Sequence, residues 1–323
     1  MTNFPAVRQK LPAVSIIIPA FQTTEYIAQA LDSVLGQTFR DFEIIVVNDG
    51  SPDTLELECV LQPYKKEIVY IKQPNGGLAR ARNVGILHSR APIIALLDSD
   101  DYWAKDFLAT QVHILEDNPA VDVVYPNALL VDYPKAAGRT YMDIYPSKGA
   151  VTFLSILNGE CTVMGPGATI RRAIFERTGL YDPELRHAED LDLWLRILKH
   201  NGRIIYHRRP VYHLRYRLDS LSRQSSKMHA SILGILEKME KMFSLSEEEK
   251  AAVENARQRI SAAIHLERGK AAFFRGDVES AIREIASSNQ YKRSWKLGLV
   301  LVLMKTAPGV LRSLAAIRSR ESP

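Results

Sequence analysis

The chain has 323 residues, enough for one large domain or two with a sizeable buried core. Its hydrophobic content of 46% and charged content of 24% are those of an ordinary globular protein, and no segment reaches the roughly 18 apolar residues of a membrane-spanning helix. The net charge of +5 lies at the C-terminus, because residues 291–323 hold seven Lys and Arg and one acid, which leaves 35 basic and 36 acidic groups before them. This distribution excludes a general nucleic-acid surface and indicates a local partner of the tail.

Short apolar runs in the first hundred residues predict buried strands. They are rich in Ile and Val and cover residues 14–18, 44–47, 68–71 and 93–97. Between the first two runs, apolar residues from Ile27 to Leu35 recur at helical spacing, with Thr23 or Thr24 as the expected cap. Gly76 and Gly77 open a second predicted helix. This alternation predicts a mostly parallel sheet covered on both faces, with ligands beyond the carboxyl ends of its strands.

A second stretch, about residues 120 to 222, mixes strand and helix signals. Residues 121–125 and 204–206 read as strands, and residues 191–198 form a helical pattern whose apolar face ends just before Gly202. After about Lys227 the strand signals stop, and helical patterns run on.

The C-terminal region is predicted to be helical throughout. Ser246 with Glu249 forms a capping box, the helix that follows reaches Phe274, and another helix begins at Val278. The segment "HLERGKAAFFRGDVESAIREI" resembles a single tetratricopeptide hairpin, without a repeating period.

Three groups of acids sit where chemistry is expected. The strand ending at Leu97 runs into Asp98, Asp100 and Asp101, and a D-x-D pair can share Mg²⁺ or Mn²⁺, although such aspartates also cap helices. Asp49 ends another strand, where it can bind a base or ribose or simply form an Asx turn. Asp190 begins the 191–198 helix, where it suits the helix dipole or accepts a proton from a substrate hydroxyl.

Four longer segments together resemble family 2 glycosyltransferases over about residues 12 to 222. They are "SIIIPAFQTTEYIAQALDSVLGQTFRDFEIIVVNDGSPD", "NGGLARARNVGI", "LLDSDDYW" and "GLYDPELRHAEDLDLWLRI". The resemblance implies a GT-A fold, a Rossmann-like α/β sandwich, and inverting transfer of a sugar from a nucleotide diphosphate to an acceptor hydroxyl. It divides the chain into a catalytic domain, residues 1–226, with a nucleotide-binding half at 12–103 and an acceptor half at 120–222. A helical region with a basic tail, residues 227–323, follows.

The resemblance also implies roles for single residues. The backbone of Pro19 and Ala20 lines the nucleotide pocket, Asp49 contacts the base, and Arg82 lies near the nucleotide. In the D-x-D segment, Asp98 faces the ribose, Ser99 belongs to the nucleotide site and Asp100 holds a divalent cation, Mn²⁺ or Mg²⁺. Asp190 matches the catalytic base, and Asp192, one step further round the helix, is expected to matter much less.

One position departs from the family pattern. Arg217 in "LRYRLDSLSRQ" stands where the family often has a metal-binding His. A guanidinium cannot ligate a metal at neutral pH but can pair with phosphate, so we expect Arg217 to share in neutralising the diphosphate.

The expected partners follow from the same comparison. The donor is a nucleotide-diphosphate sugar, most simply a UDP-sugar, and the acceptor is a saccharide or lipid-linked molecule used in polysaccharide or glycoconjugate synthesis. The N-terminus lacks a signal peptide and Cys59 and Cys161 lack metal spacing, which favours a cytoplasmic location. The tail, residues 291–323, mixes Trp295 and apolar residues with bases, so we expect peripheral contact with the inner membrane face, or else a helix packed on the helical region.

Two other functions are weighed against this one. A nucleotidyltransferase would also use paired acids, but "IPAFQTTEY" lacks the glycine-rich basic stretch expected after its first strand. A non-catalytic sugar-nucleotide or partner-binding module does not need Asp190 together with Asp49, Asp98 and Asp100.

Overall fold

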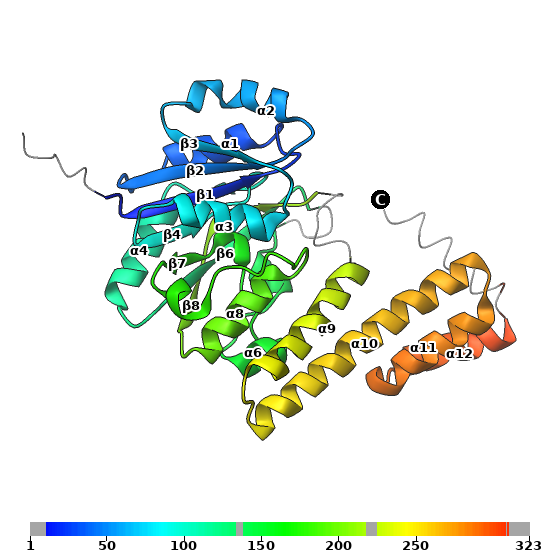
Figure 1. Ribbon diagram of the computed structural model, residues 1–323. Coiled ribbons are helices and arrows are strands. Elements are labelled where there is room, and N and C mark those ends of the chain that lie inside the picture. The colour runs from blue at the N-terminus through cyan, green and yellow to red at the C-terminus, as the bar shows by residue number, and fades with distance from the viewer. Residues whose placement is uncertain (1–10, 134–137, 218–224, 308, 310–323) are drawn as a thin grey trace, which may run out of the picture. The chain divides into compact units, whose positions relative to one another are not determined.

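The computed structural model describes residues 11–133, 138–217, 225–307 and 309 (Figure 1). The chain divides into two compact units, with the boundary between residues 220 and 221. Each unit is described by itself.

The first unit is built on one eight-stranded sheet. The strands are β1 (Val14–Ala20), β2 (Phe42–Asp49), β3 (Ile68–Gln73), β4 (Ile93–Leu96), β5 (Tyr102–Trp103), β6 (Val123–Val131), β7 (Thr169–Arg171) and β8 (Ile204–Arg215). Their order is β3-β2-β1-β4-β7-β6-β8-β5. The pairs among β1, β2, β3 and β4 and the β6–β8 pair are parallel, whereas β7 and β5 pair antiparallel with their neighbours. The predicted mostly parallel α/β architecture is confirmed.

Helices connect and cover these strands. They are α1 (Ile27–Leu35), α2 (Thr54–Leu61), the 3₁₀ helix η1 (Gln62–Tyr64), α3 (Leu78–His88), α4 (Phe107–Asp117), α5 (Tyr141–Ile144), α6 (Phe153–Leu157), η2 (Gly165–Gly167), α7 (Ile174–Thr178) and α8 (Glu189–Lys199). Helix α3 packs directly on β1 and β2. It can do so because Gly85 has no side chain, and a Cβ there would collide with Ile17. Strand β1 is buried on both faces along its whole length, as expected of a strand in the middle of a covered parallel sheet.

Most elements of this unit lie where the sequence predicts them. The four predicted strands of the first hundred residues are β1, β2, β3 and β4, and the predicted helices are α1, α3 and α8. The predicted cap of α1 is wrong. Tyr26 is the N-cap and makes no side-chain cap, because the Thr24 hydroxyl donates instead to Asp53 in the next loop.

The topology brings several strand ends to one edge of the sheet. Strand β1 lies between β2 and β4, and all three are parallel. Their carboxyl ends therefore carry Ala20, Asp49 and Asp98 to the same edge. The chain passes from β1 to β2 on one side and later returns from β3 to β4 on the other side of β1, so the strand order reverses here, which is where open α/β sheets form ligand sites.

The second unit contains only helices in the part that the structure describes. These are α9 (Ser225–Met242), α10 (Glu247–Arg275), α11 (Val278–Lys292) and α12 (Trp295–Thr306). The predicted Ser246–Glu249 capping box is present, and the break falls at Gly276, which adopts a left-handed conformation. Helix α11 packs on α10 and α12 through an apolar cluster that includes Phe273, Ile285 and Met304. None of the described helices combines the length and apolarity needed to cross a membrane.

Candidate active site

The three acids after β4 have three different partners. Asp98 Oδ1 accepts a hydrogen bond from Arg82 Nη2 at 2.9 Å, and Asp100 Oδ2 accepts one from Arg217 Nη1 at 3.2 Å. Asp101 is buried and accepts from the Tyr212 hydroxyl at 2.8 Å and from the Arg215 amide at 2.7 Å. Asp101 therefore fastens the loop to β8, which leaves Asp98 and Asp100 as the pair that faces the sheet edge.

Burial and neighbouring carboxylates both raise the pKa of acids at this edge. Burial raises the pKa of Asp100, the charge of Asp98 raises it further, and Arg217 opposes both effects. Burial also raises the pKa of Asp101 well above its usual range, with Asp100 and Asp98 adding to it. Additional positive charge at this position would therefore stabilise the ionised carboxylates.

Asp49 holds a loop in place. Its carboxylate accepts hydrogen bonds from Gln73 Nε2 at 2.6 Å and from the Gly76 and Gly77 amides at 2.7 and 2.8 Å. The side-chain bond that holds the turn after β2 comes from Asn48 rather than Asp49, because Asn48 Oδ1 accepts from the Ser51 amide, three residues on, at 2.9 Å. Asp49 thus fixes the 73–77 loop that leads into α3, and its carboxylate is already well supplied with donors.

The end of β1 supplies buried backbone rather than reactive groups. Pro19 and Ala20 pair with Val47 and Asn48 of β2, and Ala20 is 1% exposed. Ser99 is buried and donates to the Thr23 hydroxyl at 2.8 Å. The loop after β1 and the loop after β4 are therefore joined below the carboxylates.

Arg82, on α3, is fully buried and bridges two distant carboxylates. Its Nη2 donates to Asp98 and its Nη1 donates to Glu189 Oε1 at 2.8 Å. Burial acts to lower the pKa of Arg82, but the neighbouring groups, Asp98 first, outweigh it and raise the pKa. Arg82 therefore stays charged and ties the β4 end to the start of α8.

Helix α8 begins with a strained residue. Its N-cap, Ala188, has φ 57° and ψ 25°, the left-handed conformation that residues with a Cβ seldom adopt. Such strain persists only where surrounding contacts enforce it, and it often marks functional sites. Directly after it come Glu189, which is buried, and Asp190, which is partly exposed.

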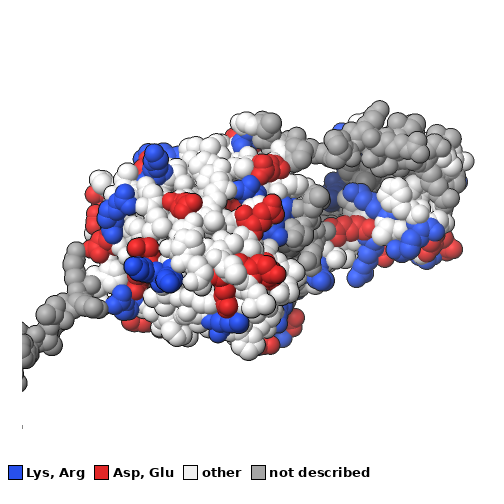
Figure 2. All heavy atoms as spheres, turned by 90° about the horizontal axis from the view of Figure 1, so that it is seen from above, with Lys and Arg blue, Asp and Glu red and all other residues white. Residues whose placement is uncertain are grey.

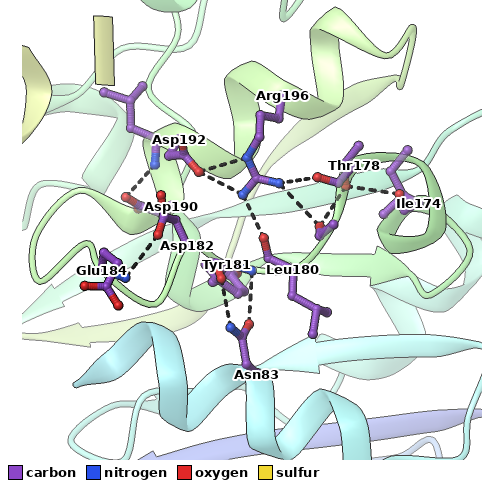
Figure 3. Close-up of polar contacts among 12 residues, drawn as sticks. Asn83, Ile174, Thr178, Leu180, Tyr181, Asp182, Glu184, Asp190, Asp192 and Arg196 are labelled. Carbon is purple, nitrogen blue, oxygen red and sulfur yellow. Dashed lines mark hydrogen bonds and ion pairs between the residues drawn. The ribbon is translucent and has the colours of Figure 1, made fainter. Parts of the chain in front are cut away.

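Asp190 lies at the helix N-terminus beside the η2 turn. Its Oδ1 accepts a hydrogen bond from the Leu191 amide at 2.8 Å, as drawn in Figure 3. A Cβ at Gly165 would come within 2.7 Å of Asp190 Oδ2, so the absence of a side chain there makes room for the carboxylate. Burial raises the pKa of Asp190, and Arg82 opposes that rise. Its proton affinity is thus higher than that of an ordinary aspartate, which suits a proton acceptor.

Glu189 shares this environment. Burial raises its pKa to about 7, Arg82 opposes the rise, and the charge of Asp190 adds to it. Arg82 therefore forms ion pairs with Asp98 and Glu189, and its charge also lowers the pKa of Asp190 against the effect of burial.

Asp192 lies in the buried interior and forms an ion pair with Arg196. It is fully buried, and its Oδ2 accepts from Arg196 Nε at 2.8 Å (Figure 3). Arg196 in turn donates to the carbonyl oxygens of Thr178, Gly179 and Leu180. This pair fixes the chain that leads into α8, so Asp192 contributes to the stability of the fold, and the expectation that its loss affects sugar transfer much less than the loss of Asp190 stays a prediction.

The same chain is tied to α3 by Asn83. Its Nδ2 donates to the Tyr181 carbonyl at 2.8 Å and its Oδ1 accepts from the Tyr181 amide at 3.0 Å, as Figure 3 shows. The Tyr181 ring lies against the guanidinium of Arg82, at 5.5 Å from its centroid. Arg82 and Asn83, adjacent on α3, thereby hold both ends of the segment before α8.

Arg217 lies at the rim of an open hollow of about 830 Å³. Tyr26, Gln22 and Tyr216 also line this hollow. Arg217 Nη2 donates to the Gln22 carbonyl at 3.2 Å, and its guanidinium stacks on the Tyr26 ring at 5.1 Å. The predicted neutralising arginine therefore contacts Asp100 and borders open space large enough for a ligand.

The carboxylates fit a divalent cation only in part. Among the residues described, no three His, Cys, Asp or Glu side chains gather into a metal cluster. Asp100 offers hard oxygen ligands, and a cation would offset the charge of Asp98, which adds to the rise that burial gives to the pKa of Asp100. A cation at Asp100 would thus take most of its ligands from water and a bound diphosphate.

The predicted residues fall into two groups in space. Asp98, Asp100 and Arg217 meet at the sheet edge, and Arg82 links Asp98 to the helix that carries Asp190, whereas Asp49 is engaged by its own loop. Elsewhere on the face seen in Figure 2, acidic and basic side chains of the first unit are interspersed.

Sequence reasoning missed the structural partners of these residues. Glu189 is the second partner of Arg82, and the Asp192–Arg196 pair has i,i+4 spacing that a search for helical ion pairs would have found. Tyr181 carried no signal beyond its place in the motif.

The chain is similar in sequence to a known protein family and to several bacterial proteins. A model of glycosyl transferase family 2 matches residues 15–179, a range that ends before Asp190. A putative glycosyltransferase of Bacillus subtilis, EpsH, is 30% identical over 234 residues, which cover 70% of this chain and 67% of that protein. An uncharacterized glycosyltransferase of Rickettsia prowazekii is 33% identical over 196 residues, which cover 58% of this chain and 59% of that protein. In the similar protein of Rickettsia felis, the match spans only 32% of its length.

Solved structures resemble the fold at low identity. Staphylococcus aureus TarS 1–349 in complex with UDP-GlcNAc superimposes with a TM-score of 0.61 at 20% identity, covering 86% of this chain and 81% of that one. The mannosyltransferase PcManGT of Pyrobaculum calidifontis, in complex with GDP-Man and Mn²⁺, gives 0.62 at 18% identity, covering 96% and 85%. These neighbours are GT-A glycosyltransferases, and the predicted GT-A fold is confirmed.

Proposed function

Because the chain belongs to glycosyl transferase family 2 and is a transferase enzyme, we propose that it moves a sugar with inversion from a nucleotide-diphosphate sugar to an acceptor hydroxyl. The structural neighbours bind UDP-GlcNAc and GDP-Man, which supports a nucleotide-sugar donor. We take a UDP-sugar as the first candidate and polysaccharide or glycoconjugate synthesis as the setting.

The observation that carries this proposal is the bridge made by Arg82. It connects Asp98, at the carboxyl end of β4, to Glu189, the residue before Asp190. The acids proposed for the donor and the acid proposed as base are therefore positioned by one buried side chain. Direct displacement needs the donor and the proton acceptor to be held in a fixed relation.

The proposed reaction is a single displacement. Asp190 accepts the proton of the acceptor hydroxyl as its oxygen bonds to the anomeric carbon of the donor. The bond from that carbon to the diphosphate breaks on the opposite face, and the diphosphate leaves with the electron pair. Arg217, paired with Asp100, lies where it can bind the departing phosphate oxygens. A divalent cation held by Asp100, when bound, would neutralise diphosphate charge.

The remaining predicted residues take supporting roles. The backbone of Pro19 and Ala20, with Ser99, forms the floor of the proposed donor site, and Asp98 faces the ribose. Asp49 is proposed to border the base while it fixes the 73–77 loop. Arg82 is proposed as a positioning residue rather than a phosphate ligand, because both of its terminal nitrogens already donate to carboxylates.

A binding screen tests the donor proposal. UDP-, GDP- and dTDP-sugars are added with and without Mn²⁺, and the melting temperature and heat of binding are measured. One nucleotide sugar should raise the melting temperature, more so with the metal. Binding of none of them would contradict the donor proposal, and binding without any transfer or donor hydrolysis would favour a non-catalytic module.

The C-terminal helix supports a proposed contact with a membrane surface. On α12, Trp295, Leu299 and Val302 recur at spacing that places them on one face, and they are 73%, 52% and 55% exposed. The opposite face packs in the helical unit, where Met304 is buried. Helix α12 thus presents an exposed apolar face with Lys296 and Lys305 on the same helix, a combination that supports contact with an anionic membrane surface. Part of the basic tail, residues 308 and 310–323, lies outside the described residues.

A further inference from the structure

The acceptor half contains partly exposed tyrosines that form two ring pairs. Tyr141 and Tyr145 lie on and just after α5, with ring centroids 4.9 Å apart and planes at 37°. Tyr133, which follows β6, packs against Tyr216 at the end of β8, with centroids 4.4 Å apart. Tyr145 is 44% exposed, so its ring is open to a ligand.

The two pairs are near each other and near Asp190. Burial raises the pKa of Tyr145, and the Tyr133 hydroxyl adds to that rise. Burial also raises the pKa of Tyr141, and Asp190 is the charge that raises it most. Tyr216, the ring partner of Tyr133, borders the hollow that Arg217 also lines.

Their positions are fixed by the local backbone. Thr140 and Asp143 form a capping box that starts α5. Asn127 Oδ1, on β6, accepts a hydrogen bond from the Met142 amide at 3.0 Å. Because the backbone between Tyr141 and Tyr145 is held in this way, their rings are presented in a set orientation rather than as mobile surface groups.

Resting on the proposed function, we infer that Tyr133, Tyr141 and Tyr145 form the acceptor subsite and that it takes the pyranose ring of an uncharged saccharide. A pyranose has an apolar face of C–H groups that packs on an aromatic ring and a rim of hydroxyls. Tyrosine offers both an apolar face and a hydroxyl that can donate or accept. Placing such a ring on Tyr141 or Tyr145 would bring one of its hydroxyls toward Asp190.

The balanced charges of residues 126–167 argue against an acceptor rich in phosphate. Residues 126–167, the stretch that carries the three tyrosines, contain three basic and three acidic side chains, so this stretch has no excess of positive charge. A polyol-phosphate chain would need several cations along its path. A stretch that presents tyrosines and whose charges balance favours a neutral sugar as the acceptor, whether that sugar is free, in a polysaccharide or carried on a lipid.

The test measures binding of small acceptor analogues to the full chain with the preferred nucleoside diphosphate present. The probes are octyl β-glucopyranoside, β-galactopyranoside, β-mannopyranoside and N-acetyl-β-glucosaminide, with 1-O-octylglycerol as the ringless control and glycerol 1-phosphate as the charged one. We expect at least one pyranoside to bind saturably and, when the nucleotide sugar replaces the nucleoside diphosphate, to accept sugar. Neither control should do so.

Variants then locate the site. Tyr145→Ala should weaken pyranoside binding about tenfold, since a lost stacking contact is worth about 1.4 kcal/mol. Tyr145→Phe keeps the ring and should retain most of the affinity. Tyr133→Ala serves as a second variant, and Tyr291→Ala, on α11 with a similar exposure of 40%, as the matched control. Nucleoside-diphosphate affinity and melting temperature should not change in Tyr145→Ala.

Two sets of results separate the inference from the proposed function. Failure of every pyranoside to bind, equal binding of a control probe, or unchanged pyranoside affinity in both Tyr145→Ala and Tyr133→Ala overturns the acceptor subsite. Failure of every nucleotide sugar to bind contradicts the proposed function itself, whatever the acceptor probes do.

Discussion

Arg82 and Glu189 lie 107 positions apart in the sequence, yet Arg82 Nη1 donates to Glu189 Oε1 at 2.8 Å in the buried interior. A single substitution on α3 is therefore expected to disturb the start of α8, where the proposed base lies. A buried pair of this kind is a weak source of net stability but is costly to break, because one charge is left without its partner. The role of this ion pair is to hold α3 and the start of α8 in a fixed relative position.

Glu189 predicts how stability depends on pH in the ligand-free protein. Burial raises its pKa from an ordinary value of 4.5 to about 7, so the folded state binds its proton more tightly than the unfolded state. The free energy of unfolding should therefore fall as the pH rises from about 4.5 to about 7, by the contribution of this group. Glu189→Gln should flatten that part of the curve of melting temperature against pH. An unchanged slope in the variant would show that Glu189 does not hold the proton.

Asp192 predicts a loss of stability rather than of chemistry. Asp192→Asn removes the charge that neutralises buried Arg196, whose side chain is 5% exposed. Breaking a buried pair from one side costs about 3–5 kcal/mol. Glu184→Gln is the control, because its pair with Arg80 is exposed and should cost at most about 1 kcal/mol. Urea unfolding measures both, and equal losses would refute the assigned role.

The contrast between Asp192 and its neighbours shows where sequence reasoning stops. Periodic apolar residues and strand-end motifs predicted the β1 to β4 strands, α8 and the acids at the sheet edge, because those signals are local. The buried face of α8 also contains Asp192 and Arg196, and a pattern of apolar and polar letters reads such a pair as solvent-exposed. Which of the acids Arg82 would bind depends on residues far away in the chain. No local pattern carries that information.

Asp100 predicts how the cation acts. Mn²⁺ should strengthen binding of the nucleoside diphosphate, and Asp100→Asn should remove most of that metal-dependent gain while metal-free binding persists through Arg217. Arg217→Gln should instead weaken metal-free binding. Isothermal titration with and without Mn²⁺ measures all three proteins. Identical binding by the wild type in both conditions would rule out the cation and leave Arg217 as the main neutralising group.

The outer face of α12 predicts binding to anionic vesicles. Replacing Trp295, Leu299 and Val302 with Ser should abolish sedimentation with phosphatidylserine vesicles, because these side chains are exposed and their loss leaves the packed face of α12 intact. Nucleotide binding should persist. Leu55→Ser, 76% exposed on α2, is the matched control. High salt should weaken the binding, and equal sedimentation with neutral vesicles would count against the basic residues.

Asp190 predicts the largest effect on chemistry. Asp190→Asn keeps the size of the side chain and an oxygen that can accept from the Leu191 amide, so melting and donor affinity should stay near normal. Loss of a general base typically lowers the rate about 10²–10⁴-fold, and sugar transfer should fall by that amount.

In the wild type, burial raises the pKa of Asp190, so transfer should decline as the pH falls through a value above the ordinary range of aspartate. Glu184→Gln, on the exposed chain just before α8, should transfer normally. Near-normal transfer by Asp190→Asn would exclude Asp190 as the base, and weakened donor binding would place its carboxylate in the nucleotide site instead.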